Sequence, residues 1–406
     1  MAGFRYRAVI PATGRIATGT IEGVSRTAVM QALRRDGMMP IEAEECRTKP
    51  VERAGGRRAS AAQRKGLAHA LGELAVLLGA GLPLDRALFI IVEHVPGGVL
   101  KTAFSILRDR VKAGVPLSVA MTEARGFFPP MAAALAEAGE ASGKLDVTLG
   151  RLAEALDRGE ALRQTVGSAL IYPCILLVVA VGVILVMLLV VVPQFEALLS
   201  DVGGRLPYAT LILMDASRAI REWGLAGLAA VAGSGALLLR SLRRPGVRDA
   251  VDRKILRVPL LGKVIVNAET ARLARTLGTL VEAGVPLPTA LSIAHRALSN
   301  SHMAGVVATV AEGVKEGGGL SAPLASSGIF PPIALSFLRT GEETARLGLM
   351  LGRLADVLDR DVSTATQRMV TVMTPLITVI LGLTVAGIIA AIFSAILGIN
   401  DLAIQS

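Results

Sequence analysis

The sequence predicts a mainly α-helical integral membrane protein with two repeated cytoplasmic helical bundles, three transmembrane helices and a small N-terminal ββαβ unit. Three observations lead to this prediction: long charge-free apolar segments, a duplicated series of turn motifs, and a β-like alternation confined to residues 1–46. Of 406 residues, 52% are hydrophobic and 19% are charged, and the mean hydropathy is +0.57. Soluble globular proteins carry about 25% charged residues, so this composition favours a membrane protein. Two cysteines exclude a disulfide scaffold.

Three charge-free segments are candidates to cross a membrane: 170–192, 223–239 and 375–399. An α-helix rises about 1.5 Å per residue, so about 20 residues cross a hydrocarbon core of about 30 Å. The middle segment is the shortest and the richest in Gly and Ala, and it lies at the lower limit of length. Because none of the three contains Asp, Glu, Lys, Arg or His, the sequence argues against a transporter or channel.

The distribution of basic residues predicts the orientation in the membrane. Of the 43 Lys and Arg, only Arg205, Arg218 and Arg221 lie in 193–222, and none follows the last apolar segment. Lys and Arg next to membrane spans stay on the cytoplasmic side. We therefore expect a cytoplasmic N-terminus, with residues 193–222 on the opposite side. The net charge of +10 then reflects topology, and one Trp with three Tyr offer little for stacking bases, so we expect no nucleic-acid partner.

An internal repeat covers most of the chain. Three turn motifs occur twice, in the same order and with nearly the same spacing: Gly81-Leu-Pro83 and Gly284-Val-Pro286, Phe128-Pro-Pro130 and Phe330-Pro-Pro332, and Gly139-Glu140 and Gly341-Glu342. Between them, apolar residues recur at three and four positions, which is typical of helices. We expect Gly139 and Gly341 to end a helix, and Ser142 and Thr344 to cap the long helix that follows.

The first residues follow a different pattern. Residues 4–10 and 16–21 alternate apolar with polar or small residues, which predicts a hairpin, and a helix from Ser25 to Arg35 and a strand at 39–43 complete a ββαβ unit. The predicted domains are 1–46, N-terminal unit; 47–65, basic linker; 66–169, first bundle; 170–192, first transmembrane helix; 193–222, outer segment; 223–239, second transmembrane helix; 240–374, second bundle; 375–399, third transmembrane helix; and 400–406, outer tail.

Two charged stripes lie at the start of the long helices, at spacings that place each on one helix face: Arg151, Glu154 and Arg158 in the first copy, and Arg353, Asp356 and Arg360 in the second. Leucines three and four residues apart mark the core side of the same helices: Leu149, Leu152, Leu156, Leu351, Leu354 and Leu358. Each stripe is either a solvated surface, worth about 0.3–0.5 kcal/mol per ion pair, or a docking stripe for an acidic partner. Both interpretations remain open at this point.

Small residues recur at helical spacing in the apolar segments: Ala386, Ala390, Ser394 and Gly398 in the last, and Ala226, Ala230 and Ser234 in the middle one. Such ladders allow helix backbones to approach closely in lipid, and the alternative is a generic alanine-rich span. We expect the first ladder to be a helix-packing surface.

The sequence offers no catalytic, cofactor or metal site. His69 and Glu73 are four residues apart and could share a metal ion, but no third ligand is in sight. The run from Gly139 to Lys144 has the wrong spacing for a phosphate loop and follows a helix rather than a strand, which argues against a membrane ATPase.

At this point the sequence resembles the type II secretion F family, the inner-membrane platform proteins of type II secretion systems and type IV pilus machines. The residues that carry the resemblance are Phe4-Arg-Tyr-Arg-Ala8, the Gly14, Gly19 and Glu22 hairpin, Leu33, Gly37 and Pro40, and the three repeated turn motifs. Some secretion members bind calcium through acids near the start of the long helix. Here Gly150 stands where an acid is needed, and Glu154 alone is not a calcium site, which takes 6–8 oxygens.

The resemblance implies a non-enzymatic, multi-pass scaffold of the bacterial inner membrane with a cytoplasmic N-terminus. Its implied partners are the secretion ATPase, other inner-membrane platform subunits and pseudopilins, and it implies a homo-oligomer. The run Gly139–Gly143 and the tail Ile399–Leu402 look more like the secretion branch than the pilus branch. A type IV pilus assembly platform is the alternative, and a transporter or channel is the alternative of another class.

Overall fold

The computed structural model describes residues 2–9, 16–23, 30, 39–46, 60–124, 126–195, 208–241 and 245–405. The described residues divide into two compact units, one around the N-terminal strands and one that holds the long helices. The predicted turn at 11–14 lies outside the described residues, as does most of the predicted linker.

The N-terminal unit contains a three-stranded antiparallel sheet with the order β2-β1-β3. Its strands are β1 (Ala2–Val9), β2 (Ile16–Gly23) and β3 (Met39–Cys46). In the central strand, Tyr6 lies opposite Gly19 on one side and Ala43 on the other. The strand predicted at 39–43 is therefore present and extends to Cys46. Of the helix predicted from Ser25 to Arg35, only Met30 is described.

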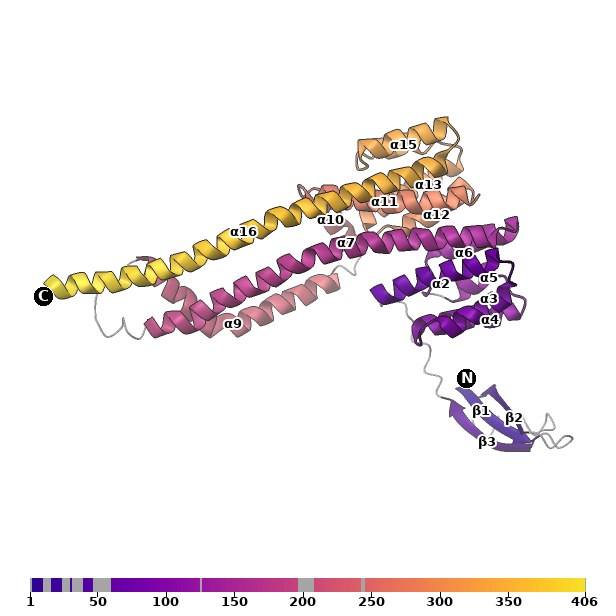
Figure 1. Cartoon of the computed structure of the whole chain (residues 1–406), viewed down its shortest axis with the longest axis horizontal. Helices are drawn as coiled ribbons and strands as arrows, with labels where there is room; N and C mark the ends of the chain where they lie inside the picture. Colours follow the sequence, from indigo (N-terminus) through magenta and orange to yellow (C-terminus); the bar gives the residue numbers. More distant parts are fainter. Residues whose placement is uncertain are drawn as a thin grey trace. The chain divides into compact units, whose positions relative to one another are not determined.

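The first helical bundle begins with a capping box, because Ser60 Oγ accepts from the Gln63 amide at 3.2 Å while Gln63 Oε1 accepts from the Ser60 amide at 2.8 Å. Residues 61–65, predicted as linker, are therefore helical. The helices of this bundle are α2 (Ala61–Gly79), α3 (Leu84–His94), α4 (Val99–Lys112), α5 (Leu117–Glu123), α6 (Pro130–Ser142) and α7 (Leu145–Val186) (Figure 1).

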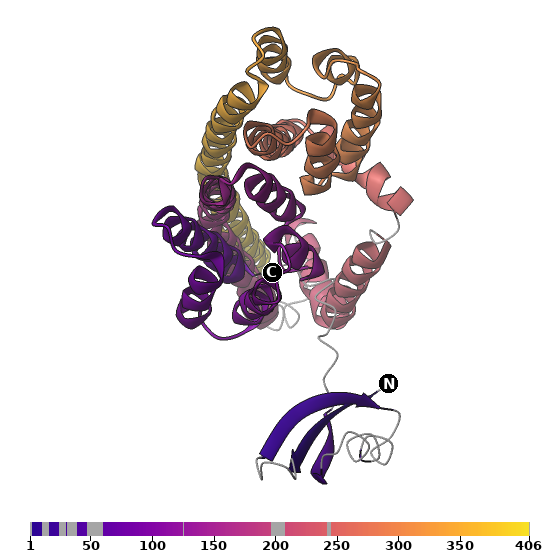
Figure 2. The same ribbon diagram turned by 90° about the vertical axis from the view of Figure 1, so that its right-hand side faces the viewer.

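The second bundle repeats this order after α10 (Pro245–Leu256). Its elements are α11 (Leu261–Glu282), α12 (Leu287–Ala294), the short 3₁₀ helix η2 (His295–Ala297), α13 (Ser301–Lys315), α14 (Ser321–Ser326), α15 (Pro332–Glu343) and α16 (Leu347–Gln405). Figure 2, a view along the long helices, shows α11 to α15 gathered beside α16 and α2 to α6 gathered beside α7. The prediction of a mainly α-helical protein is confirmed.

Equivalent turns separate the first two helices of each copy. Gly81 and Gly284 have φ values of +86° and +87°, a left-handed conformation that glycine adopts without strain. Two residues later, Pro83 and Pro286 are the N-cap residues of α3 and α12. The repeated Gly-x-Pro motif of the sequence is therefore a turn between two helices in both copies.

The prediction for the Gly-Glu motifs is wrong. Gly139 and Gly341 do not end their helices, since α6 runs on to Ser142 and α15 to Glu343. Nor does Ser142 cap the next helix: its hydroxyl donates back to the Ala138 carbonyl at 2.7 Å. The Thr344 hydroxyl donates in the same way to the carbonyl of the residue four positions earlier, at 2.6 Å.

The two glycines are instead places where the following helix comes close. A Cβ at position 139 would lie 2.1 Å from Thr148 Oγ1 and 2.9 Å from Leu145 Cα. A Cβ at position 341 would lie 3.0 Å from Leu347 Cα. The contacts at position 139 are closer than real Cβ atoms make, so any larger residue would displace the following helix, whereas at position 341 a Cβ would be tightly packed.

The neighbouring glutamates tie each helix hairpin to a short helix. Glu140 Oε1 accepts from the Leu117 amide at 2.5 Å, and Glu140 Oε2 accepts from the Ser118 hydroxyl at 2.6 Å. Glu342 accepts equivalently from the amides of Leu320 and Ser321. These carboxylates satisfy backbone donors that a helix start leaves unpaired.

Two helices are long and apolar enough to cross a membrane. They run from Leu145 to Phe195 and from Leu347 to Ser394, and only 17% of each most apolar window is buried inside the chain. A core helix of a soluble protein would be mostly buried, so these surfaces are available to lipid. The first contains a π-helical turn, η1 (Met187–Val191). The predicted segment 170–192 lies within the first of these stretches, and 375–399 lies within α16, which continues beyond Ser394.

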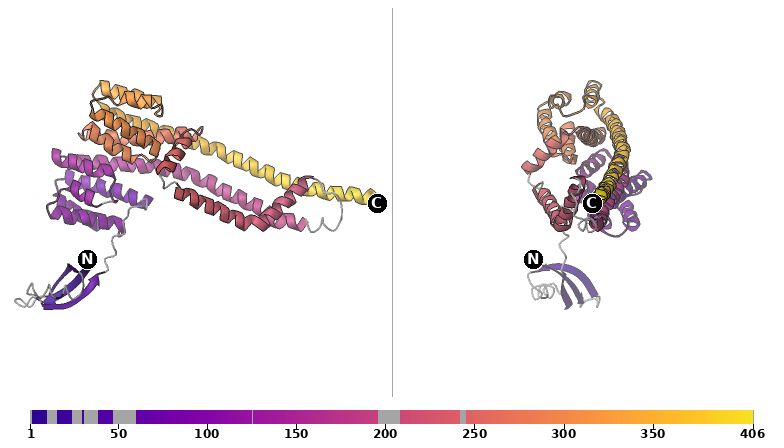
Figure 3. Two further views of the ribbon diagram at one scale, coloured as in Figure 1. Left: turned by 180° about the vertical axis from the view of Figure 1, so that it is seen from behind. Right: turned by 90° about the vertical axis from the view of Figure 1, so that its left-hand side faces the viewer.

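The third predicted transmembrane segment, 223–239, lies in α9 (Tyr208–Ser241). Side chains within α9 are described only in part, and its crossing of the membrane stays a prediction. It begins inside the predicted outer segment and packs against η1 and α16 (Figure 3). Helix α16 continues through most of the predicted outer tail, to Gln405.

A small buried cluster joins these three helices. Leu188 and Val192 pack with Met214 of α9 and with Ile388 and Ile392 of α16. Two buried hydroxyls of α9 add hydrogen bonds to carbonyls of the neighbouring helices: Thr210 Oγ1 donates to Ala391 O at 2.9 Å, and Ser217 Oγ donates to Leu188 O at 2.6 Å. The start of α9 is therefore packed against the apolar helices.

The close approach at Gly139 leads to a stability prediction. The substitution Gly139→Ala should lower the Tm of the purified protein in detergent by several degrees, because overpacking costs about 1–3 kcal/mol. Gly159→Ala is the matched control, since a Cβ at Gly159 meets nothing within 4 Å. Alanine favours a helix over glycine by up to about 1 kcal/mol, so the control should keep or raise the Tm. Equal Tm values for the two variants would contradict the packing role of Gly139.

Candidate functional site

The two copies meet where α7 and α16 run side by side (Figure 1). On the core side of these helices, the predicted leucines are buried in five of six cases, with Leu156 half-buried. On the other side lies a hollow of about 230 Å³ between the copies. Five of the six residues predicted to form charged stripes line this hollow: Arg151, Glu154, Arg158, Arg353 and Asp356.

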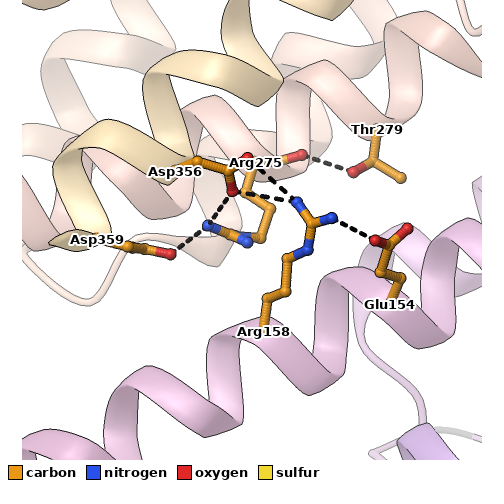
Figure 4. Close-up of polar contacts among 6 residues, drawn as sticks. All are labelled: Glu154, Arg158, Arg275, Thr279, Asp356 and Asp359. Carbon is orange, nitrogen blue, oxygen red and sulfur yellow. Dashed lines mark hydrogen bonds and ion pairs between the residues drawn. The ribbon is translucent and has the colours of Figure 1, made fainter.

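Arg158 connects the two copies (Figure 4). Its Nη1 lies 3.1 Å from Asp356 Oδ1 on α16, and its Nη2 donates to Glu154 one turn earlier on α7. The side chains of Arg158 and Asp356 are 47% and 45% exposed. Ion pairs this exposed contribute about 0–1 kcal/mol, so this pair sets orientation more than stability.

A second and more buried arginine joins the same cluster. Arg275 of α11 pairs with Asp359 and lies 3.6 Å from Asp356 Oδ1, and its side chain is only 12% exposed. Burial raises the pKa of Asp359 above its usual value, although Arg275 lies against it. Burial therefore destabilises the ionised form of Asp359 by more than the charge of Arg275 stabilises it. Neither Arg275 nor Asp359 was singled out from the sequence.

Arg151 makes a different contact between the copies. Its Nη1 donates to the carbonyl oxygen of Glu282 at 2.7 Å. Glu282 is the last residue of α11, so this carbonyl belongs to a helix end that has no partner within its own helix. A cation at a helix C-terminus is also favoured by the helix dipole. Arg151 of the first copy thus caps a helix of the second.

The predicted stripes therefore face each other, at least in part. Arg151, Glu154, Arg158 and Asp356 take part in contacts within the chain, whereas Arg353 and Arg360 are exposed. The charged faces predicted from the sequence thus lie between the two copies, where part of each contacts the other copy. Whether they also contact a partner protein stays a prediction.

The small-residue ladder of α16 does not form the contact inside the chain. Ala386, Ala390 and Ser394 are exposed, while the burial of Gly398 lies outside what the structure describes. The face that packs inside the chain carries Ile388 and Ile392. The ladder is thus available to lipid or to another helix, and its packing role stays a prediction.

The pair His69 and Glu73, considered above as metal ligands, is not formed in the structure. Glu73 pairs through Oε1 with His94 Nδ1 at 2.6 Å, which joins α2 to α3, and not with His69. Gly150 faces the Cβ of Ala75, and a Cβ built on Gly150 would lie 3.8 Å from it. Among the residues that the structure describes, no three His, Cys, Asp or Glu side chains lie together as metal ligands.

Comparison with known proteins finds the same internal repeat. The family model described as Type II secretion system (T2SS), protein F matches residues 70–193 and again 273–395. The model for the N-terminal domain of Type II secretion system protein F matches residues 1–44. The chain belongs to the type II secretion system protein F family. The resemblance noted from the sequence motifs is confirmed.

Individual relatives cover nearly the whole chain. The Type II secretion system protein F of Xanthomonas campestris pv. campestris is 36% identical over 388 residues, 92% of this chain and 93% of the relative. The protein of the same name from Pseudomonas aeruginosa is 32% identical over 404 residues, 99% of this chain and 100% of the relative. The Type IV pilus assembly protein PilC of P. aeruginosa is 30% identical over 330 residues, 81% of this chain and 88% of the relative.

The charged contact leads to a prediction about the coupling between the copies. A double-mutant cycle of Arg158→Gln and Asp356→Asn should give a coupling energy of about 0.3–1 kcal/mol in the free energy of unfolding, measured by denaturation in detergent micelles. The coupling should fall at high salt, because the pair is half exposed.

The control cycle combines Arg158→Gln with Asp361→Asn. Asp361 is an exposed carboxylate of α16 close in sequence to Asp356. Its coupling to Arg158 should be close to zero. Equal coupling energies in the two cycles would show that Arg158 responds to the overall charge of α16 and not to one partner.

Proposed function

We propose that this chain is the inner-membrane platform protein of a type II secretion system, where it couples a cytoplasmic secretion ATPase to pseudopilus assembly for protein export. One observation supports this most strongly: each of two repeated helical bundles continues, through a continuous helical stretch, into an apolar segment long enough to cross a membrane. A force applied to a bundle is thereby passed along a helix into the membrane.

The proposed topology has three transmembrane helices, with α9 supplying the second at 223–239. Both bundles, the basic linker and the N-terminal ββαβ unit lie in the cytoplasm, whereas the segment 193–222 and the tail 400–406 lie in the periplasm. Support comes from the basic residues, because only three of 43 lie in 193–222. The domain boundaries proposed from the sequence follow from this topology.

The proposed role is that of a scaffold and not of an enzyme. The charged cluster between the copies pairs arginines with carboxylates and backbone carbonyls, an arrangement that holds helices together. Its partners would be the secretion ATPase, other inner-membrane platform subunits, pseudopilins and further copies of itself. The exposed ladder of Ala386, Ala390 and Ser394 suits close packing against a helix of another copy in lipid.

The exposed arginines of the second copy are the better candidates for partner contact. Arg353 and Arg360 lie on one face of α16 and are exposed, so a charge reversal there leaves the contact of Arg158 with Asp356 in place. A pair of cations at an interface rim mainly sets orientation and association rate with an acidic surface.

A tagged chain purified from its native membrane tests both levels of the proposal. Pseudopilins and a secretion ATPase should co-purify with it, and the variant Arg353→Glu with Arg360→Glu should recover several-fold less ATPase, most clearly at low salt. The matched control reverses two other exposed cations of the second bundle, Lys315→Glu with Arg339→Glu, and should recover ATPase normally.

The outcomes separate the alternatives. Pilins together with a retraction ATPase would assign the chain to the type IV pilus branch, which the 30% identity to PilC makes the second candidate. An equal loss of co-purified ATPase in both double variants would mean that ATPase capture depends on overall charge and not on Arg353 and Arg360. Recovery of none of these partners would contradict the platform role itself.

A further inference from the structure

A second hollow lies at the foot of the first apolar segment. It has a volume of about 690 Å³ and is lined at its polar end by Arg64, Glu160, Arg163 and Gln164, and towards the apolar segment by Ser168 and Ile171. It lies between the start of α2 and α7, away from the charged contact between the copies.

Among the described residues, Glu160 is the one carboxylate that lines this hollow, and it is paired mainly with Arg64. Glu160 is 4% exposed and accepts two hydrogen bonds from Arg64, at 2.7 Å from Nε and 3.2 Å from Nη2. This bidentate pairing is the strongest arrangement available to a carboxylate and a guanidinium. Arg163 Nη1 lies farther away, 3.6 Å from Glu160 Oε2. The hollow thus carries one cation more than its carboxylate neutralises.

A third arginine lies near enough to act on Arg163. Burial lowers the pKa of Arg163 below its usual value, and the positive charges of Arg272 and Arg64 lower it further. Arg272 belongs to α11, where it is held by Glu269 at 3.0 Å. An anion in the hollow would relieve the repulsion that acts on Arg163.

The position of the hollow relative to the apolar segment indicates which kind of anion would reach it. Arg163 precedes the apolar segment at Leu170 by two helical turns, about 10 Å along the helix axis. Polar headgroups occupy about 5–8 Å on each side of the hydrocarbon core. The long arginine side chain reaches this layer, while Ile171 and Tyr172, both 58% exposed, already lie in the apolar segment.

We propose that this hollow binds the headgroup phosphate of an anionic phospholipid of the cytoplasmic leaflet. Arg163 supplies the charge and a two-pronged donor, Gln164 and Ser168 supply an amide and a hydroxyl, and an acyl chain lies along Ile171 and Tyr172. Basic hollows beside transmembrane helices on the cytoplasmic side are the typical place for such headgroups. The proposal rests on the proposed topology, which puts this end of α7 in the cytoplasmic leaflet. A continuous path from a cationic to an apolar surface fits a lipid better than a free phosphate ion.

The test is lipid binding by the full chain, purified in detergent and titrated with phosphatidylglycerol or with phosphatidylcholine of the same acyl chains, and read by native mass spectrometry. The wild type should bind phosphatidylglycerol more tightly. Arg163→Gln should weaken this binding about fivefold, the value expected for one basic residue near a membrane surface. Arg163→Lys should bind with intermediate affinity, since it keeps the charge but loses the fork of donors.

Arg86→Gln is the matched control. It removes the same charge from the start of α3, beyond the opposite end of α2 from Arg64, and should leave lipid binding unchanged. Unchanged binding in Arg163→Gln, or equal loss in Arg86→Gln, would overturn the proposal. Competition by millimolar inorganic phosphate as effective as competition by lipid would also overturn it, because the site would then bind a free anion. Since the readout needs no secretion and no partner, failure of the platform role would leave this result standing.

Discussion

The structure depends on one constraint: α7 and α16 must each serve two environments without interruption. Their first turns bury one leucine face in a helical bundle, and their later turns expose apolar side chains on most sides. Burial of each leucine contributes about 1.5–3 kcal/mol, so the bundles are fixed firmly to these helices. The other contacts are arranged around these two helices, because each joins the bundle that packs on it to an apolar segment long enough to cross a membrane.

The contact between the copies lies on the bundle half of these helices and is chemically different from the leucine cores. It uses partly exposed charges and a helix-end carbonyl, which hold orientation at little cost in free energy. Arg275 of α11 stands at the repeat position of Gly72 of α2, 203 residues earlier. A glycine in one copy and a buried arginine in the other make the two bundles unequal at this repeat position. A platform with unequal halves can present different surfaces to different partners.

The sequence predicted what depends on local pattern. The helical class, the glycine and proline turns at Gly81 and Gly284, and the buried leucines follow from periodicity and backbone preference. It could not predict what depends on distant neighbours. Gly139 was interpreted as a helix end, because nothing local reveals that Thr148 packs against it. Asp359 was overlooked for the same reason: its equivalent, Asp157, is exposed, and only the arrival of Arg275 on another helix buries it.

The central claim is that both bundles lie on the cytoplasmic side and that the long helices carry them into the membrane. The most direct measurement fuses a reporter enzyme that is active only in the periplasm at two positions of the chain. A fusion near Gly203, between the first two proposed spans, should be active. A fusion after Leu260, at the start of the second bundle, should be inactive although the protein is present at the same level. Activity at Leu260 would place the second bundle outside the cytoplasm and contradict the account.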